Sequence, residues 1–378
     1  MRSEERRYVG IDLGKRTWVM MMVKRTGKLV KNARGEEEPE EKLGKCQGKT
    51  TAEGRAKLYQ KLKSGDKVAL EAGNLAFIMA KELEQAVGCE IRVLNPSHLA
   101  IIYATDKKTD PEDALKLAHL LTDRPDSRLP IVPVPSDEEM ARRKVLASYA
   151  REQRVRNQGI NRLHALFVHQ GITTVVRKDL ATKGNREATV GQLTGLEREE
   201  AEHLMACLSH YEARIAALEK RMAEQAEGDE QIERLQTVPG VGPKVSFAFS
   251  AYVQAERFAN AAQVSNYLGL VPRVSMSGTI VRYGRITKRG NGYLRALLVQ
   301  AAWAVTWSRN GGALRERYEY MTGVKGIGKK KAIVAIARRL AVVMYTLLKN
   351  GTEYEVRHLE IRKRPEKTAV LAQEALSA

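Results

Sequence analysis

Four acidic residues in the first third of the chain have the types and positions expected of a metal site. Asp12 lies within the apolar run YVGIDLG, and Glu71 follows the apolar residues of KVALEAG. A carboxylate on a buried strand is costly unless it is paired, hydrogen-bonded or bound to a metal ion. Asp110 and Asp113 are three residues apart in DPEDALKLAHLL, where Pro111 suits the first turn of a helix. We therefore predict that Asp110 is the helix N-cap and that Asp113 lies beside it on the same face.

The order of these acids along the chain indicates one shared site. Each has an ordinary alternative explanation, because a strand-end acid often pairs with a lysine and an Asp-x-x-Asp sequence often only caps a helix. Four carboxylates that meet cannot all remain ionised without cations. Two Mg²⁺ ions about 3.5–4 Å apart would neutralise them and polarise a scissile phosphate, with Mn²⁺ as a possible substitute. Of the nearby acids, we place Asp106 at the surface and expect Glu112 to point away.

A glycine-containing basic segment in the last third of the chain is suited to the phosphate backbone of a nucleic acid. Five cations fall within fourteen residues, among Gly284, Gly290 and Gly292: Arg282, Arg285, Lys288, Arg289 and Arg295. Arginine and lysine bind phosphate oxygens, and glycine allows close approach of the backbone. We predict that this segment binds nucleic acid, with a solvated basic loop as the alternative.

The four acids can meet at one site only if a sheet brings distant segments of the chain together. We expect an antiparallel hairpin of residues 8–14 and 17–23, a possible third strand at 28–33 and a charged loop at 35–49. Helices and strands should then alternate at 51–64, 67–73, 74–88 and 90–95, with further helices at 96–106 and 110–121. An antiparallel meander followed by strand–helix–strand is the order of a ribonuclease H-like sheet. In such a sheet the strand acids and the helical acid pair converge on one edge.

The middle of the chain has the pattern of a long amphipathic helix. Apolar residues step by four and three over about three heptads between charged neighbours: Leu204, Leu208, Tyr211, Ile215, Leu218 and Met222. For this heptad seam we favour coiled-coil association between subunits, with a helical hairpin packing on its own domain as the alternative.

Two glycine turns in the last third each precede an apolar helix. TVPGVGPKVS and TGVKGIGKKKA resemble the backbone clamps of helix-hairpin-helix proteins, in which free N–H groups at a helix N-terminus hold a phosphate. We count their lysines, Lys244, Lys329 and Lys330, among the nucleic-acid-binding residues. Ordinary glycine caps between helices are the alternative.

Composition and charge agree with a nucleic-acid-binding protein. Across 378 residues, 64 Lys and Arg exceed 45 Asp and Glu, and the net charge of +19 favours a polyanionic partner. The three cysteines have neither disulfide nor zinc spacing, and the N-terminal residues lack the apolar core of a signal peptide. The apolar run IVAIARRLAVVMYTLL is interrupted by two arginines, so it does not suit a membrane span. We therefore expect a cytoplasmic location.

Two sets of motifs resemble one known protein family. YVGIDLGK, VALEAGN and KKTDPEDALKLAHLL are similar to the Asp-Glu-Asp-Asp motifs of bacterial insertion-sequence transposases and Piv-type DNA invertases, whose N-terminal domain is similar to the Holliday-junction resolvase RuvC. YLGLVPRVSMSGTIVRYGRITKRGNGYLRALL resembles the transposase domain of that family, and GIGKKKAIVAIARRLAVVMYTLL resembles its closing helix. The resemblance implies a RuvC-like catalytic domain at 1–135, a helical or coiled-coil region at 136–230, a mainly helical transposase domain at 231–352 and a tail at 353–378.

The resemblance also implies a nucleophile. In that family the serine of a Ser-Gly motif holds DNA through a phosphoserine bond, and Ser277, which precedes Gly278, matches it. Met276 and Thr279 stand where the family commonly has a second Ser and a second Gly, which leaves Ser275 as the alternative. A serine hydroxyl is a weak nucleophile, and no His lies in this loop. We therefore predict a composite site in which the metal-bound carboxylates activate Ser277 and nearby cations stabilise the transition state.

The implied activity is that of a recombinase that moves its own mobile element. The resemblance implies that it acts on donor and target DNA as a homo-oligomer, a dimer or tetramer, guided by a structured bridge RNA. A RuvC-like junction nuclease that uses water as its nucleophile is the enzymatic alternative, and a non-catalytic nucleic-acid scaffold is the alternative from another class. A site-specific DNA invertase would share the chemistry of the transposase.

Overall fold

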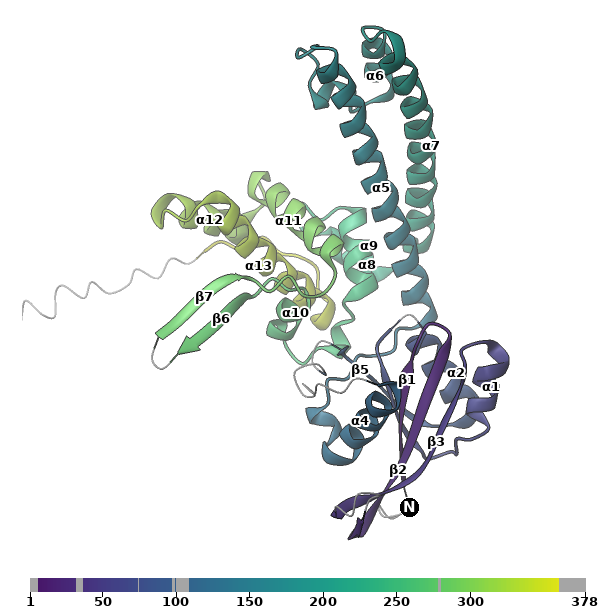
Figure 1. Ribbon diagram of the computed structural model, residues 1–378. Coiled ribbons are helices and arrows are strands. Elements are labelled where there is room, and N and C mark those ends of the chain that lie inside the picture. Colours follow the sequence, from purple (N-terminus) through teal and green to yellow (C-terminus); the bar gives the residue numbers. More distant parts are fainter. Residues whose placement is uncertain are drawn as a thin grey trace, which may run out of the picture. The chain divides into compact units, whose positions relative to one another are not determined.

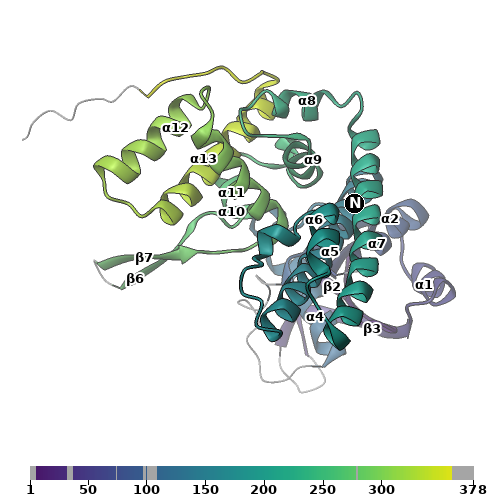
Figure 2. The ribbon, with the colours of Figure 1, turned by 90° about the horizontal axis from the view of Figure 1, so that it is seen from above.

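The chain forms two compact units, Met1–Ser136 and Asp137–Ala378. The computed structural model describes residues 6–31, 37–73, 75–96, 99, 109–277 and 280–359, and Figures 1 and 2 show its ribbon from two directions. The division falls at the end of the proline-containing segment 129–136, whose backbone is irregular apart from an isolated bridge between Leu94 and Ile131. Each unit encloses apolar clusters of its own.

A mixed five-stranded sheet forms the centre of the first unit, with the strand order β3-β2-β1-β4-β5. The strands are β1 (Arg7–Leu13), β2 (Thr17–Lys31), β3 (Glu37–Lys49), β4 (Lys67–Glu71) and β5 (Glu90–Leu94). β2 pairs antiparallel with β1 and β3, whereas β4 pairs parallel with β1 and β5. The mixed α/β class predicted for this part of the chain is confirmed.

Helices cover both faces of this sheet. They are α1 (Ala52–Tyr59), α2 (Ala76–Val87) and α4 (Asp110–Asp123), and a 3-10 turn (Asp126–Arg128) follows α4. Val9 and Ile11 of β1 join a buried cluster with Met79 of α2. The intervening Gly10 faces α4, which lies on the opposite side of the sheet in Figure 1. Because strand side chains alternate between faces, Asp12 faces α4 as well.

The predicted loop at 35–49 is a strand. Residues 37–49 form the edge strand β3, and β2 continues to residue 31 without a separate third strand. An edge strand pairs on one side only and tolerates charge and proline, so it lacks the apolar alternation by which a sequence reveals a central strand. Gly48 of β3 lies opposite Trp18, whose indole ring occupies the space that a Cβ at Gly48 would need. Long-range pairing therefore decides the structure of this polar segment.

The helix starts agree with local capping chemistry, with one difference from prediction. Thr51 caps α1 by accepting a hydrogen bond from a backbone N–H in the first turn. The N-cap of α4 is Thr109, so Asp110 is the first helical residue and not the cap. Of the helix predicted at 96–106, only residues 96 and 99 are described. Asp106 falls outside the described residues.

Gly10 allows α4 to cross β1 at close range. A Cβ at Gly10 would lie 1.9 Å from the carbonyl oxygen of Ala114 and 2.6 Å from the amide nitrogen of Ala118, both on the helix backbone. We expect Gly10→Ala to lower the free energy of unfolding by about 2–3 kcal/mol, because backbone atoms cannot yield as a side chain can. Urea denaturation measures this loss.

Gly44→Ala is the matched control for this prediction. Its Cβ would lie 3.4 Å from the flexible end of the Met22 side chain, so we expect a change within about 0.5 kcal/mol. Equal losses in the two variants would contradict the close crossing of α4 over β1.

Two long helices form the first part of the second unit. They are α5 (Asp137–His169) and α7 (Gly195–Ala226). A 3-10 turn (Arg177–Leu180) and α6 (Lys183–Val190) lie where α5 ends and α7 begins (Figure 1). Leu204 and Leu208 of the heptad seam are buried with Leu163 and Phe167 of α5. The seam is therefore filled by side chains of the same chain. This corrects the prediction of a coiled coil between subunits in favour of the helical hairpin.

Shorter helices build the rest of the second unit. They are α8 (Glu230–Gln236), α9 (Pro243–Tyr252), α10 (Ala261–Tyr267), α11 (Gly292–Trp307), α12 (Gly312–Glu319) and α13 (Lys329–Asn350), with a 3-10 turn (Ala255–Arg257) and a π turn (Tyr320–Val324). Their apolar side chains share one core with parts of α5 and α7, which confirms the predicted helical class of this region. No helix in the described ranges is both long enough and apolar enough to cross a membrane.

A β-hairpin replaces the loop predicted around Ser277. Its strands are β6 (Pro272–Ser277) and β7 (Ile280–Ile286), and Figure 1 shows it extending from the helices of this unit. Val274, Met276, Val281 and Tyr283 are all exposed and pair directly across the two strands. Val274 and Met276 alternate with Ser275 and Ser277, so the sequence carries the strand pattern here, although both faces of the ribbon are exposed.

Candidate active site

Asp12 and Glu71 end two neighbouring parallel strands. Ile11 of β1 pairs with Leu70 of β4, so the two acids follow as neighbours at the carboxyl ends of these strands. Ala69, two residues before Glu71, is buried among α4 side chains. By the alternation of strand side chains, both acids are directed to the face of the sheet that α4 covers.

The first turn of α4 carries the other two acids. Asp110 and Asp113 occupy its first and fourth positions, one helical turn apart. Lys116, one turn further on, pairs with Asp113 at 3.0 Å between Nζ and Oδ1. The close crossing at Gly10 holds this end of α4 over β1. The sheet and the helix thus bring the four predicted acids into one region, and Glu112 is exposed, as Asp110 is.

The electrostatics of Asp12 show that the four acids influence one another. The pKa of Asp12 is raised from 3.8 to about 6, first by burial and then by the negative charges of Asp110, Asp113 and Glu71 in that order. Within the described ranges, no three His, Cys, Asp or Glu side chains converge closely enough to form a metal site as they stand.

A cleft of ≈ 460 Å³ opens beside these acids. It is lined by Asp12 and Glu71 together with Leu13, Gly14, Lys15, Ala72, Gly73, Leu75 and Ala76. Lys15 was not among the predicted site residues, although it directly follows the IDLG motif, and Lys116 could have been found from its helical spacing to Asp113. The cleft places a lysine next to the acids, where an anionic group such as a phosphate could enter.

The donor set at this cleft suits a hard divalent cation. All four candidate ligands are carboxylates, and Mg²⁺ prefers oxygen ligands. A cation would also relieve the mutual repulsion that raises the pKa of Asp12. These residues therefore fit the predicted magnesium site in both ligand type and charge.

The raised pKa of Asp12 predicts how stability depends on pH without divalent cations. The folded protein binds the Asp12 proton more tightly than the unfolded chain, so this contribution to stability is lost as the pH rises from 3.8 through about 6. Asp12→Asn cannot ionise, so in EDTA at pH 7 we expect it to be more stable than the wild type, with a smaller difference near pH 4. Urea midpoints at both pH values measure this. If the wild type were more stable than the variant at pH 7 in EDTA, the repulsion between Asp12 and the other three acids would be contradicted.

Ser277 lies in the second unit, at the described end of β6. It is exposed and pairs in register with Ile280, while Ser275 lies opposite Arg282. Residues that pair directly share one face of a hairpin, and residues two apart on a strand share it too. Ser275, Ser277 and Arg282 are therefore on one face of the hairpin, opposite the apolar Met276. Gly278, the other half of the Ser-Gly motif, falls outside the described residues.

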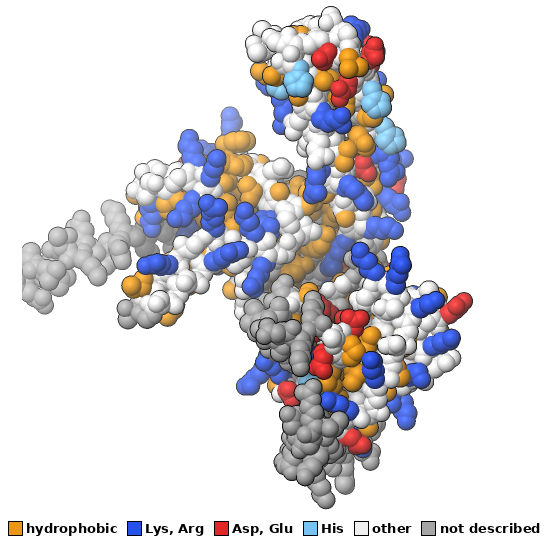
Figure 3. Space-filling view, in the orientation of Figure 1, with side chains coloured by type: hydrophobic (Ala, Val, Ile, Leu, Met, Phe, Trp, Pro, Cys, Tyr) orange, Lys and Arg blue, Asp and Glu red, His pale blue; other side chains and the backbone are white. Residues whose placement is uncertain are grey.

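The predicted nucleic-acid-binding cations differ in their surroundings. Arg282, Arg285, Lys288 and Arg289 are exposed on and after β7, and Lys329 and Lys330 are exposed at the start of α13. Figure 3 shows Lys and Arg side chains gathered over the helices and hairpin of this unit. These positions are open to a phosphate backbone.

Two of the predicted cations have partners within the protein. Arg295 donates from Nη1 to the carbonyl oxygens of Leu268 and Arg289 at 3.0 and 2.7 Å, so it holds the basic loop in place. Lys244 pairs with Glu219 at 2.6 Å and lies 5.2 Å from the ring centroid of Tyr149. Their roles in the structure were not visible in the sequence, because their partners are distant along the chain.

Comparison with known proteins identifies relatives for both units. Residues 9–170 match the family model DEDD_Tnp_IS110, described as Transposase, and residues 232–319 match a model described as Transposase IS116/IS110/IS902 family. A probable family 20 transposase of Pseudomonas aeruginosa is 31% identical over 304 residues, which cover 76% of this chain and 85% of the relative. The transposase for insertion sequence element IS1328 of Yersinia enterocolitica is 26% identical, with 76% and 85% covered. The pilin gene-inverting protein of Moraxella bovis is 29% identical, with 32% and 38% covered.

Proposed function

The chain belongs to the IS116/IS110/IS902 family of insertion-sequence transposases, which are DNA-cleaving and recombining enzymes, and from this premise we propose how it cuts and rejoins DNA. The chemistry depends on divalent cations held by Asp12, Glu71, Asp110 and Asp113, with Ser277 as the nucleophile. The observation that carries the proposal is the placement of Asp12 and Glu71 on neighbouring strands beside the first turn of α4, where the charges of Asp110, Asp113 and Glu71 help to raise the pKa of Asp12.

The four carboxylates would hold two Mg²⁺ ions, with Mn²⁺ as a substitute. When bound, Mg²⁺ supplies positive charge that polarises the scissile phosphate. Asp12 and Glu71 would hold the cations from the sheet, and Asp110 and Asp113 would complete the ligand set from α4. Lys15, which lines the same cleft, contributes charge toward the DNA phosphate. In this role the acids act only when ionised.

Ser277 performs the covalent step. Its Oγ loses a proton and bonds to phosphorus while the bond from phosphorus to one deoxyribose oxygen breaks, and that oxygen takes up a proton. In the second step an incoming DNA hydroxyl attacks the phosphoserine, which rejoins the strand and returns the serine hydroxyl. Arg282, on the same face of the hairpin, stabilises the negative charge that develops on the phosphate. The exposure of Ser277 supports this role.

The partners follow from the activity and from the charge of the chain. We propose donor and target DNA as substrates, a structured bridge RNA as the guide, and a homo-oligomer, a dimer or tetramer, as the active form in the bacterial cytoplasm. The net charge of +19 suits either nucleic acid. Arg282, Arg285, Lys288 and Arg289 on the hairpin and its following loop would contact the backbone.

The test combines the protein with end-labelled donor and target DNA, Mg²⁺ and RNA transcribed from the flanking locus. Joined donor–target strands that form only with RNA and Mg²⁺ are the expected result. Cleavage of junction DNA without joining would favour a RuvC-like nuclease that uses water. Inversion of a segment would favour an invertase, a function that the name of the Moraxella relative supports.

A further inference from the structure

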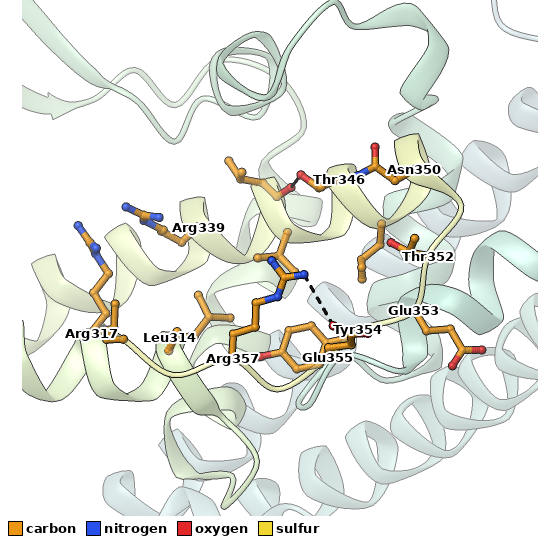
Figure 4. Close-up of a pocket in the computed structure, with 15 residues that line it drawn as sticks. Leu314, Arg317, Arg339, Thr346, Asn350, Thr352, Glu353, Tyr354, Glu355 and Arg357 are labelled. Atoms are coloured by element: carbon orange, nitrogen blue, oxygen red, sulfur yellow. Dashed lines mark hydrogen bonds and ion pairs between the residues drawn. The ribbon is translucent and has the colours of Figure 1, made fainter. Parts of the chain in front are cut away.

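A cavity in the second unit has no part in the proposed chemistry. It measures ≈ 430 Å³ and lies between α12, α13 and the segment 352–359 that follows α13 (Figure 4). Leu314 and Leu347, both buried, line it together with Val342 and Val343. Its volume lies within the range of about 300–1,000 Å³ that is usual for small-molecule sites.

The segment after α13 forms a fixed wall of this cavity. The amide of Ala313 donates to the carbonyl oxygen of Arg357 at 2.6 Å, and the amide of Tyr354 donates to Oγ1 of Thr237 at 3.0 Å. Gly312 accommodates the contact, because a Cβ there would lie 2.6 Å from the same carbonyl oxygen of Arg357. The wall is therefore built by specific contacts to α12 and to the turn after α8.

One end of the cavity is positively charged without compensation. Figure 4 shows Arg317 of α12 and Arg339 of α13 together at this end, and Arg338 adds a third charge nearby. In the described part of the chain none of the three has an acidic partner, because the acids of α12 are engaged elsewhere. Glu316 pairs with His358, and Glu319 pairs with Arg315. Burial and the charges of Arg317 and Arg338 lower the pKa of Arg339.

The opposite end of the cavity offers hydrogen-bond acceptors. Figure 4 shows Asn350 and Glu353 at this end, away from the two arginines. Both residues line the cavity, as does Thr352. The cavity thus has Arg317 and Arg339 at one end, apolar side chains together with Arg357 and Tyr354 along its middle, and Asn350 and Glu353 at the other end. A matching ligand carries an anion, an apolar body and N–H donors in that order.

We propose that this cavity binds one nucleotide of an unpaired DNA strand, with its phosphate on Arg317 and Arg339 and its base extended toward Glu353. A guanidinium pair holds phosphate oxygens through charge-assisted hydrogen bonds. The sugar and base lie against the apolar floor, and exocyclic N–H groups of the base donate to the acceptors at the far end. The assignment to DNA rests on the proposed function, because transposases of this family act on DNA.

Isothermal titration calorimetry of the full-length protein with dGMP tests this proposal. We expect dGMP to bind at least about tenfold more tightly than deoxyguanosine or inorganic phosphate, because each lacks one half of the recognised group. Arg317→Gln combined with Arg339→Gln should weaken dGMP binding by about tenfold or more. Thr346→Phe fills the cavity from its exposed edge and should weaken dGMP binding without changing the affinity for inorganic phosphate.

Arg315→Gln is the matched control, because its guanidinium already pairs with Glu319 at 2.8 Å on the same helix. It should leave dGMP affinity within about twofold of the wild type. Unchanged binding in the Arg317→Gln/Arg339→Gln variant would overturn the proposal, as would equal affinities for dGMP and inorganic phosphate. Tighter binding of GMP than of dGMP would overturn the assignment to DNA. A mononucleotide contains no scissile strand, so this result is independent of the proposed roles of Asp12 and Ser277.

Discussion

Asp12→Asn is expected to lower the rate of DNA strand cleavage by about a thousandfold or more while the protein stays folded. The amide keeps the size of the side chain but removes the negative charge that holds a cation between the sheet and α4. Asp12 is the penultimate residue of the central strand β1, and the charges of all three other acids raise the pKa of its carboxyl. Single-turnover cleavage of end-labelled DNA in Mg²⁺ measures the loss.

Glu112→Gln provides the control for this prediction. Glu112 lies in the same helical turn as Asp110 and Asp113, but it is not among the charges that shift the pKa of Asp12. Its variant should cleave within about twofold of the wild-type rate. Equal loss in Glu112→Gln, or wild-type cleavage by Asp12→Asn, would remove the acids from the mechanism. Mg²⁺ should also raise the urea midpoint of the wild type and leave that of Asp12→Asn unchanged.

Ser277→Ala is expected to abolish the covalent protein–DNA adduct. A methyl group has no lone pair to attack phosphorus, so we expect no detectable adduct, and not merely a reduced amount of it. Ser277 is exposed at the end of β6, so the substitution leaves no cavity and should not change stability. Denaturing gels of labelled DNA, followed by protease digestion of the shifted band, detect the adduct.

Ser275→Ala separates the two candidate nucleophiles. Ser275 lies on the same face of the hairpin, two residues earlier on β6 and directly opposite Arg282. We expect this variant to form the adduct at a rate within about tenfold of the wild type, since it would disturb only a neighbour of the reacting group. Adduct formation by Ser277→Ala together with its loss in Ser275→Ala would reassign the nucleophile. Adducts from both variants would leave the water-dependent nuclease as the better mechanism.

The four acids could be found from the sequence because their positions depend on local signals. Asp12 and Glu71 end apolar strands, and Asp110 begins a helix that Pro111 helps to start. Each element could therefore be placed without knowledge of the others, apart from the N-cap, which is Thr109. Membership of an enzyme family rules out the non-catalytic scaffold that composition alone left open.

Other features depend on partners that are distant along the chain. The polar segment 37–49 is a strand only because β2 offers it an edge, and the seam of α7 is filled by α5. The roles of Arg295 and Lys244 depend in the same way on Leu268 and Glu219. The arginine end of the nucleotide cavity combines residues of α12 and α13 that no motif connects.

By itself, the sequence determined the identity and order of the four candidate metal-binding acids, the Ser-Gly motif and the excess of positive charge. Backbone periodicity and residue type are local properties, so they can be identified from the sequence without a structure. The tertiary structure alone decided which side chains meet. Gly10 lets α4 approach β1, and the acids then share one electrostatic environment, as the raised pKa of Asp12 shows. Proximity depends on packing across the sheet, which no single stretch of sequence encodes.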